Sequence, residues 1–141
     1  MLVIANCVTG PADLAAWIED EYRIVLSTLD DVSGFHDFYL RKLIAANEEC
    51  TFVSLTTWDD MSDFRAWRHS EVFLSAHRAR VDRAKFGRLR TPRRYDYLVT
   101  GAPDLAELDS LVLASLIDSD HLPSGSTATF EGILNYARAA G

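Results

Sequence analysis

Two side chains that could do chemistry stand ten residues apart, Trp67 and His77, in a stretch whose apolar spacing is mostly that of helix. An imidazole nitrogen can bind iron, and an indole on the same wall can press against a flat ligand. Asn6, the one strongly polar residue of the apolar segment 2–9, adds an amide that can donate a hydrogen bond. Each is ordinary alone, but together they suggest a haem pocket.

The segments that must position these residues predict an α+β chain. Apolar and β-branched residues over 2–9 predict a first strand. Apolar residues at three- and four-residue spacing predict an amphipathic helix over 12–29. Segments 35–45 and 51–58 predict two strands joined as a hairpin, because they alternate or are rich in β-branched and aromatic residues.

Two short helices and a last strand should follow. One of the two aspartates after the hairpin can cap a helix that carries Trp67, and Ser70 can cap the helix that carries His77. Residues 94–99 predict the last strand. The order β-α-β-β-α-β is that of the ferredoxin-like split βαβ fold, with helices on one face of an antiparallel sheet. Two copies often pair to close the open face of such a sheet, so we expect a homodimer.

Residues 101–141 follow this predicted domain of residues 1–100 and carry six acidic side chains and one arginine. Their apolar spacing predicts a helix over about 104–118, and residues 130–140 could form one more short helix. We therefore expect an acidic, helical C-terminal extension that packs on the core or on a partner subunit.

The composition, 48% hydrophobic and 25% charged, is ordinary for a globular protein. No apolar run approaches the roughly 18 residues of a membrane span, and the first residues lack a signal-peptide pattern, so we expect a cytoplasmic protein without membrane contact. Cys7 and Cys50 lack metal-type spacing and are expected to be reduced and buried. No glycine-rich nucleotide motif is present, so electrons for a redox reaction would come from elsewhere.

Residues 78–94 form the strongest charge feature, because eight basic side chains stand there against Asp82 alone. This basic stretch consists of Arg78, Arg80, Arg83, Lys85, Arg88, Arg90, Arg93 and Arg94. It calls for an anionic partner: a phosphate, a carboxylate, nucleic acid or the chain's own acidic tail. Nucleic acid is disfavoured, because the net charge is −7 and aromatic residues for base stacking are missing among these arginines, apart from Phe86.

The stretch TTWDDMSDFRAWRHSEVFLSAH over 56–77 resembles the signature of the haem-degrading monooxygenases of the antibiotic biosynthesis monooxygenase superfamily. The start MLVIAN and the Gly34-Phe35 pair also agree, so the resemblance covers roughly residues 1–100. Other members usually have a histidine where this chain has Trp67. The combination of Trp67 with His77 and Asn6 is what points to haem degradation. The resemblance implies a ferredoxin-like domain that pairs into a dimeric α/β-barrel.

That resemblance also implies roles for the three residues as the catalytic set. His77 would be the axial ligand of the iron, Trp67 would press on the porphyrin, and Asn6 would donate to oxygen on the opposite side. Haem would be both substrate and cofactor, and its cleavage would need O2 and an external electron donor such as a separate reductase.

Haem has two propionates, and arginine is the better partner for carboxylates because its planar fork bonds both oxygens. The helix that delivers His77 continues into Arg78, Arg80 and Arg83, which could therefore lie at the pocket mouth. Arg23 stands where several family members place an aromatic against the haem, with Tyr22 adjacent. Arg23 and Arg78 complete the expected haem-binding set.

Two other functions stay open at this point. A cofactor-independent monooxygenase of the same superfamily would use the same residues to line a pocket for an aromatic polyketide. A non-catalytic haem-binding protein, a carrier or sensor, would bind haem and leave it intact. Fold cannot separate these functions, whereas a haem absorption band and its decay with reductant in air can.

Overall fold

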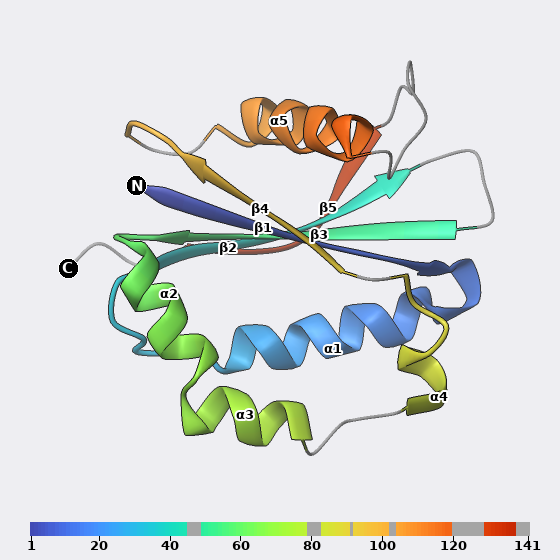
Figure 1. Ribbon diagram of the computed structural model, residues 1–141, viewed down its shortest axis with the longest axis horizontal. Coiled ribbons are helices and arrows are strands. Elements are labelled where there is room, and N and C mark those ends of the chain that lie inside the picture. Colours follow the sequence, from blue (N-terminus) through green and yellow to red (C-terminus); the bar gives the residue numbers. More distant parts are fainter. Residues whose placement is uncertain (45–48, 79–82, 91, 102–103, 120–128, 138–141) are drawn as a thin grey trace.

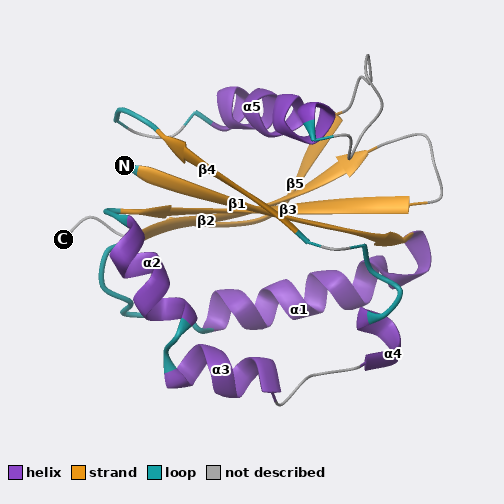
Figure 2. Cartoon of the chain, in the orientation of Figure 1, coloured by secondary structure: helices purple, strands orange, loops and turns teal. Residues whose placement is uncertain are grey.

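The computed structural model describes residues 1–44, 49–78, 83–90, 92–101, 104–119 and 129–137. Five antiparallel strands form one sheet in the order β4-β1-β3-β2-β5, with helices on both faces (Figures 1 and 2). The strands are β1 (Leu2–Pro11), β2 (Phe35–Ile44), β3 (Glu49–Trp58), β4 (Arg93–Leu98) and β5 (Thr129–Ala137). The helices are α1 (Ala15–Ser27), α2 (Met61–Arg68), α3 (Glu71–Arg78), α4 (Arg83–Phe86) and α5 (Leu105–Asp118), with a 3-10 turn, η1 (Ala12–Leu14), before α1.

One face of the sheet lies against α1 and α2, with α3 and α4 farther out (Figure 1). Side chains of β1 alternate between faces, so Leu2 and Ile4 enter the core on this side. They meet Ile18 and Tyr22, which are one turn apart on α1. This core places the end of α1 beside α2, and the candidate residues lie around that junction.

The opposite face of the sheet is covered by α5 (Figure 1). Leu108, Val112 and Leu116, each at most 1% exposed, pack there on residues of β1 and β3. The expected homodimer stays a prediction, but its ground was an open sheet face, and α5 occupies that face.

The predicted ferredoxin-like α+β arrangement is confirmed, including the helix near 104–118. The expectation of a helix at 130–140 is wrong, because residues 129–137 form β5, which pairs with β2. β2 offers a free edge, and its hydrogen-bonding groups outweigh a weak helical pattern. The division into residues 1–100 and 101–141 stays a prediction; β5 joins the same sheet as β1 to β4.

Both cysteines are free and buried, as expected, Cys7 under α5 and Cys50 on the α1 side. Burial raises the pKa of the Cys7 thiol to about 12. Among the described residues, no helix is long and apolar enough to cross a membrane.

Candidate functional site

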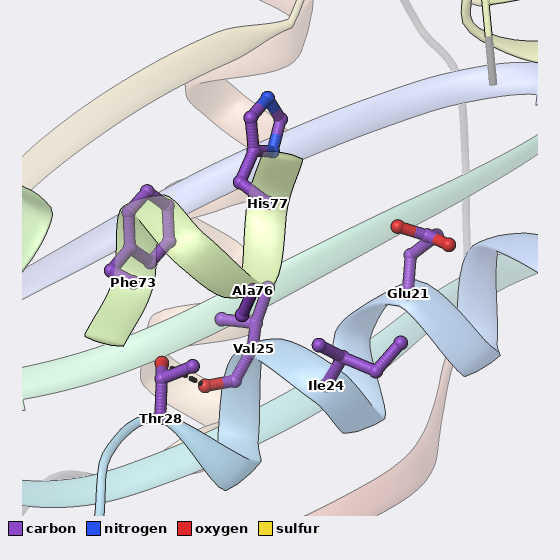
Figure 3. Close-up of a pocket in the computed structure, with 7 residues that line it drawn as sticks. All are labelled: Glu21, Ile24, Val25, Thr28, Phe73, Ala76 and His77. Carbon is purple, nitrogen blue, oxygen red and sulfur yellow. Dashed lines mark hydrogen bonds between the residues drawn. The ribbon is translucent and has the colours of Figure 1, made fainter. Parts of the chain in front are cut away.

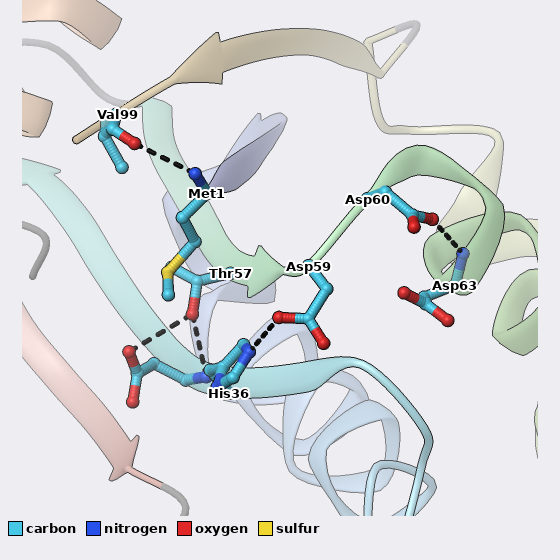
Figure 4. A network of polar contacts seen from close by, with 8 residues as sticks. Met1, His36, Thr57, Asp59, Asp60, Asp63 and Val99 are labelled. Carbon is cyan, nitrogen blue, oxygen red and sulfur yellow. Dashed lines mark hydrogen bonds and ion pairs between the residues drawn. The ribbon is translucent and has the colours of Figure 1, made fainter. Parts of the chain in front are cut away.

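Trp67 lies in the last turn of α2, a helix that Asp60 caps by accepting a hydrogen bond from the backbone N–H of Asp63 (Figure 4). The indole is 5% exposed, and its Nε1–H donates to Oγ1 of Thr28, at the end of α1, over 3.0 Å. Three aromatic rings surround it within centroid distances of 4.8–6.0 Å: Trp58, Phe64 and Phe73. Trp67 is therefore a fixed wall whose one polar atom is satisfied.

His77 lies in the last turn of α3 and is exposed. Phe73 stands one turn earlier, and the two rings stack at 6.3 Å with planes 7° apart. Phe86 of α4 flanks the imidazole at 6.1 Å. Among the described residues, neither ring nitrogen of His77 has a hydrogen bond, so the imidazole is oriented by aromatic rings and keeps both nitrogens for a ligand.

A small pocket of about 30 Å³ lies between α1 and α3 (Figure 3). Val25 and Thr28 line it from α1, and Phe73, Ala76 and His77 line it from α3. This volume holds only about one or two water molecules. A porphyrin would fit only after α3 moved away from α1, and α3 has no fully buried side chain to oppose such a movement.

Asn6 is half-buried on β1 and does not line this pocket. It lies in register with Ser54 of β3 and Arg94 of β4, so these three residues share the sheet face that α1 covers. The structure thus joins Trp67 and His77 through Phe73, and it leaves Asn6 on the floor beneath the helices.

Two buried polar atoms near this floor have no hydrogen-bond partner among the described residues, the Tyr22 hydroxyl and Nε1 of Trp58. Burial raises the pKa of Tyr22, the nearby Cys7 thiol adds to the rise, and Ser54 offsets part of it. Ser54 and the hydroxyl are nevertheless not in hydrogen-bonding geometry. Buried polar atoms without a hydrogen-bond partner are expected at a site where a ligand supplies the partner. The Tyr22 hydroxyl and Trp58 Nε1 therefore fit a ligand site near Trp67 and His77.

The first helix presents Tyr22 to the core and leaves Arg23 exposed. Tyr22 is therefore the inward-facing aromatic of α1, one residue from the position expected. Arg78 is also exposed and lies 3.9 Å from Glu71 of its own helix. Neither arginine lines the pocket.

Several residues of the basic stretch pair with acids of the chain itself, and in the ion pairs of its described residues these acids come from residues 1–100. Arg88 binds Asp13, and Arg90 binds Glu49. Arg94 lies 3.3 Å from Asp96. Arg80, Asp82 and the side chain of Arg83 lie outside the described part of the chain.

Of the other histidines, His36 has an acidic partner, because its Nε2 lies 2.6 Å from Oδ1 of Asp59 (Figure 4). His69 is exposed, and His121 lies outside the described residues. Among the described residues, no three His, Cys, Asp or Glu side chains gather into a metal site.

Sequence reasoning missed Thr28, which gives no signal because its contact with Trp67 spans 39 residues of chain. It also missed the position of Phe73 between Trp67 and His77. There the signal was available, since residues four apart on a helix share a face.

The family model "antibiotic biosynthesis monooxygenase" matches residues 1–79. The chain belongs to this family of monooxygenases. No curated protein matches the sequence.

Solved structures share the fold. The haem degrader MhuD from Mycobacterium tuberculosis, with two haems bound, is 21% identical and has a TM-score of 0.54, with 74% of this chain and 100% of that chain covered. A mutant of MhuD with two manganese protoporphyrin IX molecules is 18% identical with a TM-score of 0.58, covering 74% and 99%. SnoaB, a cofactor-independent oxygenase from Streptomyces nogalater, is 18% identical with a TM-score of 0.50, covering 73% and 97%. These identities show the fold alone.

Proposed function

We propose that this monooxygenase degrades haem, with His77 as the axial ligand of the iron. The observation that carries the proposal is the ring series Trp67–Phe73–His77, in which Phe73 and His77 line the pocket and Trp67 lies behind Phe73. It ends in an imidazole whose two nitrogens have no hydrogen bond among the described residues. Such a series suits a flat ligand whose metal meets the imidazole. The structures of MhuD with haem and with manganese protoporphyrin IX, which have this fold, support the choice.

Haem is the substrate in this proposal, and its iron supplies the activation of O2 with electrons from an external donor. His77 binds the iron, and Phe73 holds the plane of the imidazole. Trp67 forms a rigid wall against the porphyrin, because Thr28 and three aromatic rings fix its position. Asn6 contributes an amide N–H from the floor of the site. The reaction takes place in the cytoplasm, and a separate reductase is a suitable donor.

The experiment is an optical titration with hemin, followed by ascorbate in air. The wild-type protein should give a saturable Soret band that decays and releases iron. His77→Ala should lose most of the band, whereas His69→Ala, the matched control on the exposed end of α2, should behave as wild type. A stable band in the wild type would indicate a carrier or sensor, and a normal band in His77→Ala would refute the ligand assignment.

The second candidate is a cofactor-independent monooxygenase acting on an aromatic polyketide. The apolar part of the pocket lining, Val25, Phe73 and Ala76, favours it, because an apolar organic substrate needs no metal ligand. Such a substrate, like a porphyrin, would fit only after the pocket opened. The structural likeness to SnoaB is compatible with it. A wild-type protein that gives no Soret band with hemin would favour this candidate.

A further inference from the structure

Two arginines from different elements lie beside the aromatic wall, Arg68 at the end of α2 and Arg94 at the start of β4. The guanidinium carbon of Arg68 is 4.8 Å from the ring centroid of Phe73, and that of Arg94 is 5.5 Å from the ring centroid of Phe64. Both rings contact Trp67. The two guanidinium groups therefore stack on the two rings that flank Trp67.

Arg94 also lies in register with Asn6, so the two residues project from the same face of neighbouring strands. Among the described residues, Arg68 has no ion pair with an acid, and Arg94 has one ion pair, with Asp96. Burial lowers the pKa of Arg68, and the positive charge of Arg94 lowers it further. The two like charges are thus close enough to repel each other, which an arriving anion would relieve.

We infer that Arg68 and Arg94 form a receptor for the two carboxylates of a flat ligand that lies against Trp67. The inference rests on the proposed function, and it assigns the haem propionates to these residues instead of Arg23 and Arg78. A guanidinium that stacks on a ring keeps its N–H edge available, and that edge bonds both oxygens of a carboxylate. All four arginines are exposed and none lines the pocket. What distinguishes Arg68 and Arg94 is that each stacks on a ring that contacts Trp67.

The test compares hemin with hemin dimethyl ester, in which both carboxylates are masked, by optical titration of the full chain. Wild type should bind hemin about 10- to 100-fold more tightly than the ester, the factor expected for charge-assisted hydrogen bonds. Arg68→Gln and Arg94→Gln should each weaken hemin binding and leave ester binding unchanged. Arg65→Gln, an exposed arginine on the same helix, should match wild type.

If wild type binds hemin and both glutamine variants bind it equally tightly, this inference is overturned and the proposed function stays intact. Equal weakening of hemin and ester binding would also overturn it, because the arginines would then be structural. Failure of wild type to bind either porphyrin would overturn the proposed function, and this inference with it.

α5 makes polar contacts with the sheet on both sides of the apolar residues that it buries. Arg41 of β2 binds Asp109 through two hydrogen bonds, in a pair whose side chains are 14% and 17% exposed. On the other side, the Tyr97 hydroxyl lies 2.7 Å from the Ser115 hydroxyl. Apolar burial between two sets of polar contacts is the construction of a permanent interface.

The haem-degrader structures are covered over nearly their whole length by 74% of this chain. The quarter of this chain that lies outside the match is about as long as residues 101–141, which contain α5. We infer that α5 takes the place of a second copy of the chain on this sheet face, so that the protein is a monomer. A helix tethered to its own sheet binds at a high effective concentration, which a free partner cannot match.

Two measurements on the full chain test this second inference. Light scattering after size exclusion should give the mass of one chain up to about 100 μM, and a dimer at that concentration would overturn the inference. Labelling of Cys7, located by mass spectrometry, should have a rate independent of protein concentration because its cover is intramolecular. A rate that rises on dilution would mean that a partner covers the face, and it would also overturn the inference.

Discussion

The hydrogen bond between Trp67 and Thr28 can be tested by replacing Thr28 with valine, which has the same shape but no hydroxyl. Thr28 is 5% exposed and accepts the indole N–H over 3.0 Å. Its hydroxyl also donates to the Val25 carbonyl, but that carbonyl still accepts the backbone N–H of residue 28 at 3.1 Å. Thr28→Val therefore leaves one buried group without a partner, Nε1 of Trp67.

An unpartnered buried donor costs about 1–3 kcal/mol, so Thr28→Val should lower the free energy of unfolding by that amount. In a Trp67→Phe background there is no indole N–H to strand, and the same change should cost less than about 0.5 kcal/mol. The difference between the two costs, about 0.5–3 kcal/mol, is the coupling energy of the pair.

The assay is urea unfolding followed by far-ultraviolet circular dichroism, because fluorescence would change when Trp67 is removed. All four proteins of the cycle should unfold with similar dependence on urea concentration, which shows that the two-state comparison holds. Equal costs of Thr28→Val in the two backgrounds would refute the reasoning, since the hydroxyl would then stabilise the fold through contacts other than Trp67.

Three further perturbations follow from burial and from the site. Tyr22→Phe should leave the free energy of unfolding at pH 7 unchanged or raise it by up to about 1 kcal/mol, because the lost hydroxyl has no partner. Burial raises the folded-state pKa of Tyr22, so ionisation of this group leaves the free energy of unfolding unchanged below the unfolded pKa of about 10 and lowers it as pH rises further. Urea titrations above pH 10 should therefore show a shallower loss of stability in the phenylalanine variant, and identical slopes would contradict the raised pKa. Val112→Ala, under α5, should cost about 2 kcal/mol in urea unfolding, whereas the exposed Val72→Ala should cost almost nothing, and equal costs would contradict the packing of α5. Asn6→Ala should keep the Soret band with hemin but slow its decay in ascorbate and air; loss of the band would make Asn6 structural.

Local pattern was sufficient to predict most of the sheet and both longer helices, because periodic burial fixed each segment by itself. It failed at residues 129–137, whose apolar residues do not alternate. Phe130 packs on the α5 side of the sheet, while Ile133 and Leu134 pack on the α1 side. The register with β2 shifts between Leu40 and Arg41, and such an irregularity breaks the two-residue period that marks a strand.

The site was predictable as a set of residue types but not as an arrangement. The ten-residue spacing of Trp67 and His77 does not fix their distance, because α2 ends at Arg68 and a new helix starts at Glu71. Their connection through Phe73, and the hold of Thr28 on Trp67, depend on how α1 meets both helices. Contacts across such distances in sequence leave no periodic trace.

The site therefore has two parts with different mechanical properties, and this division bears on the proposed function. Trp67 is held by a buried hydrogen bond and by the rings of Trp58 and Phe64, which lie outside α3, whereas α3, which carries His77, has no fully buried side chain. Moving α3 away from α1 would lose little apolar burial, and moving Trp67 would strand a polar atom. A porphyrin entering this site would therefore find its wall already in place and would take its iron ligand from the helix that yields.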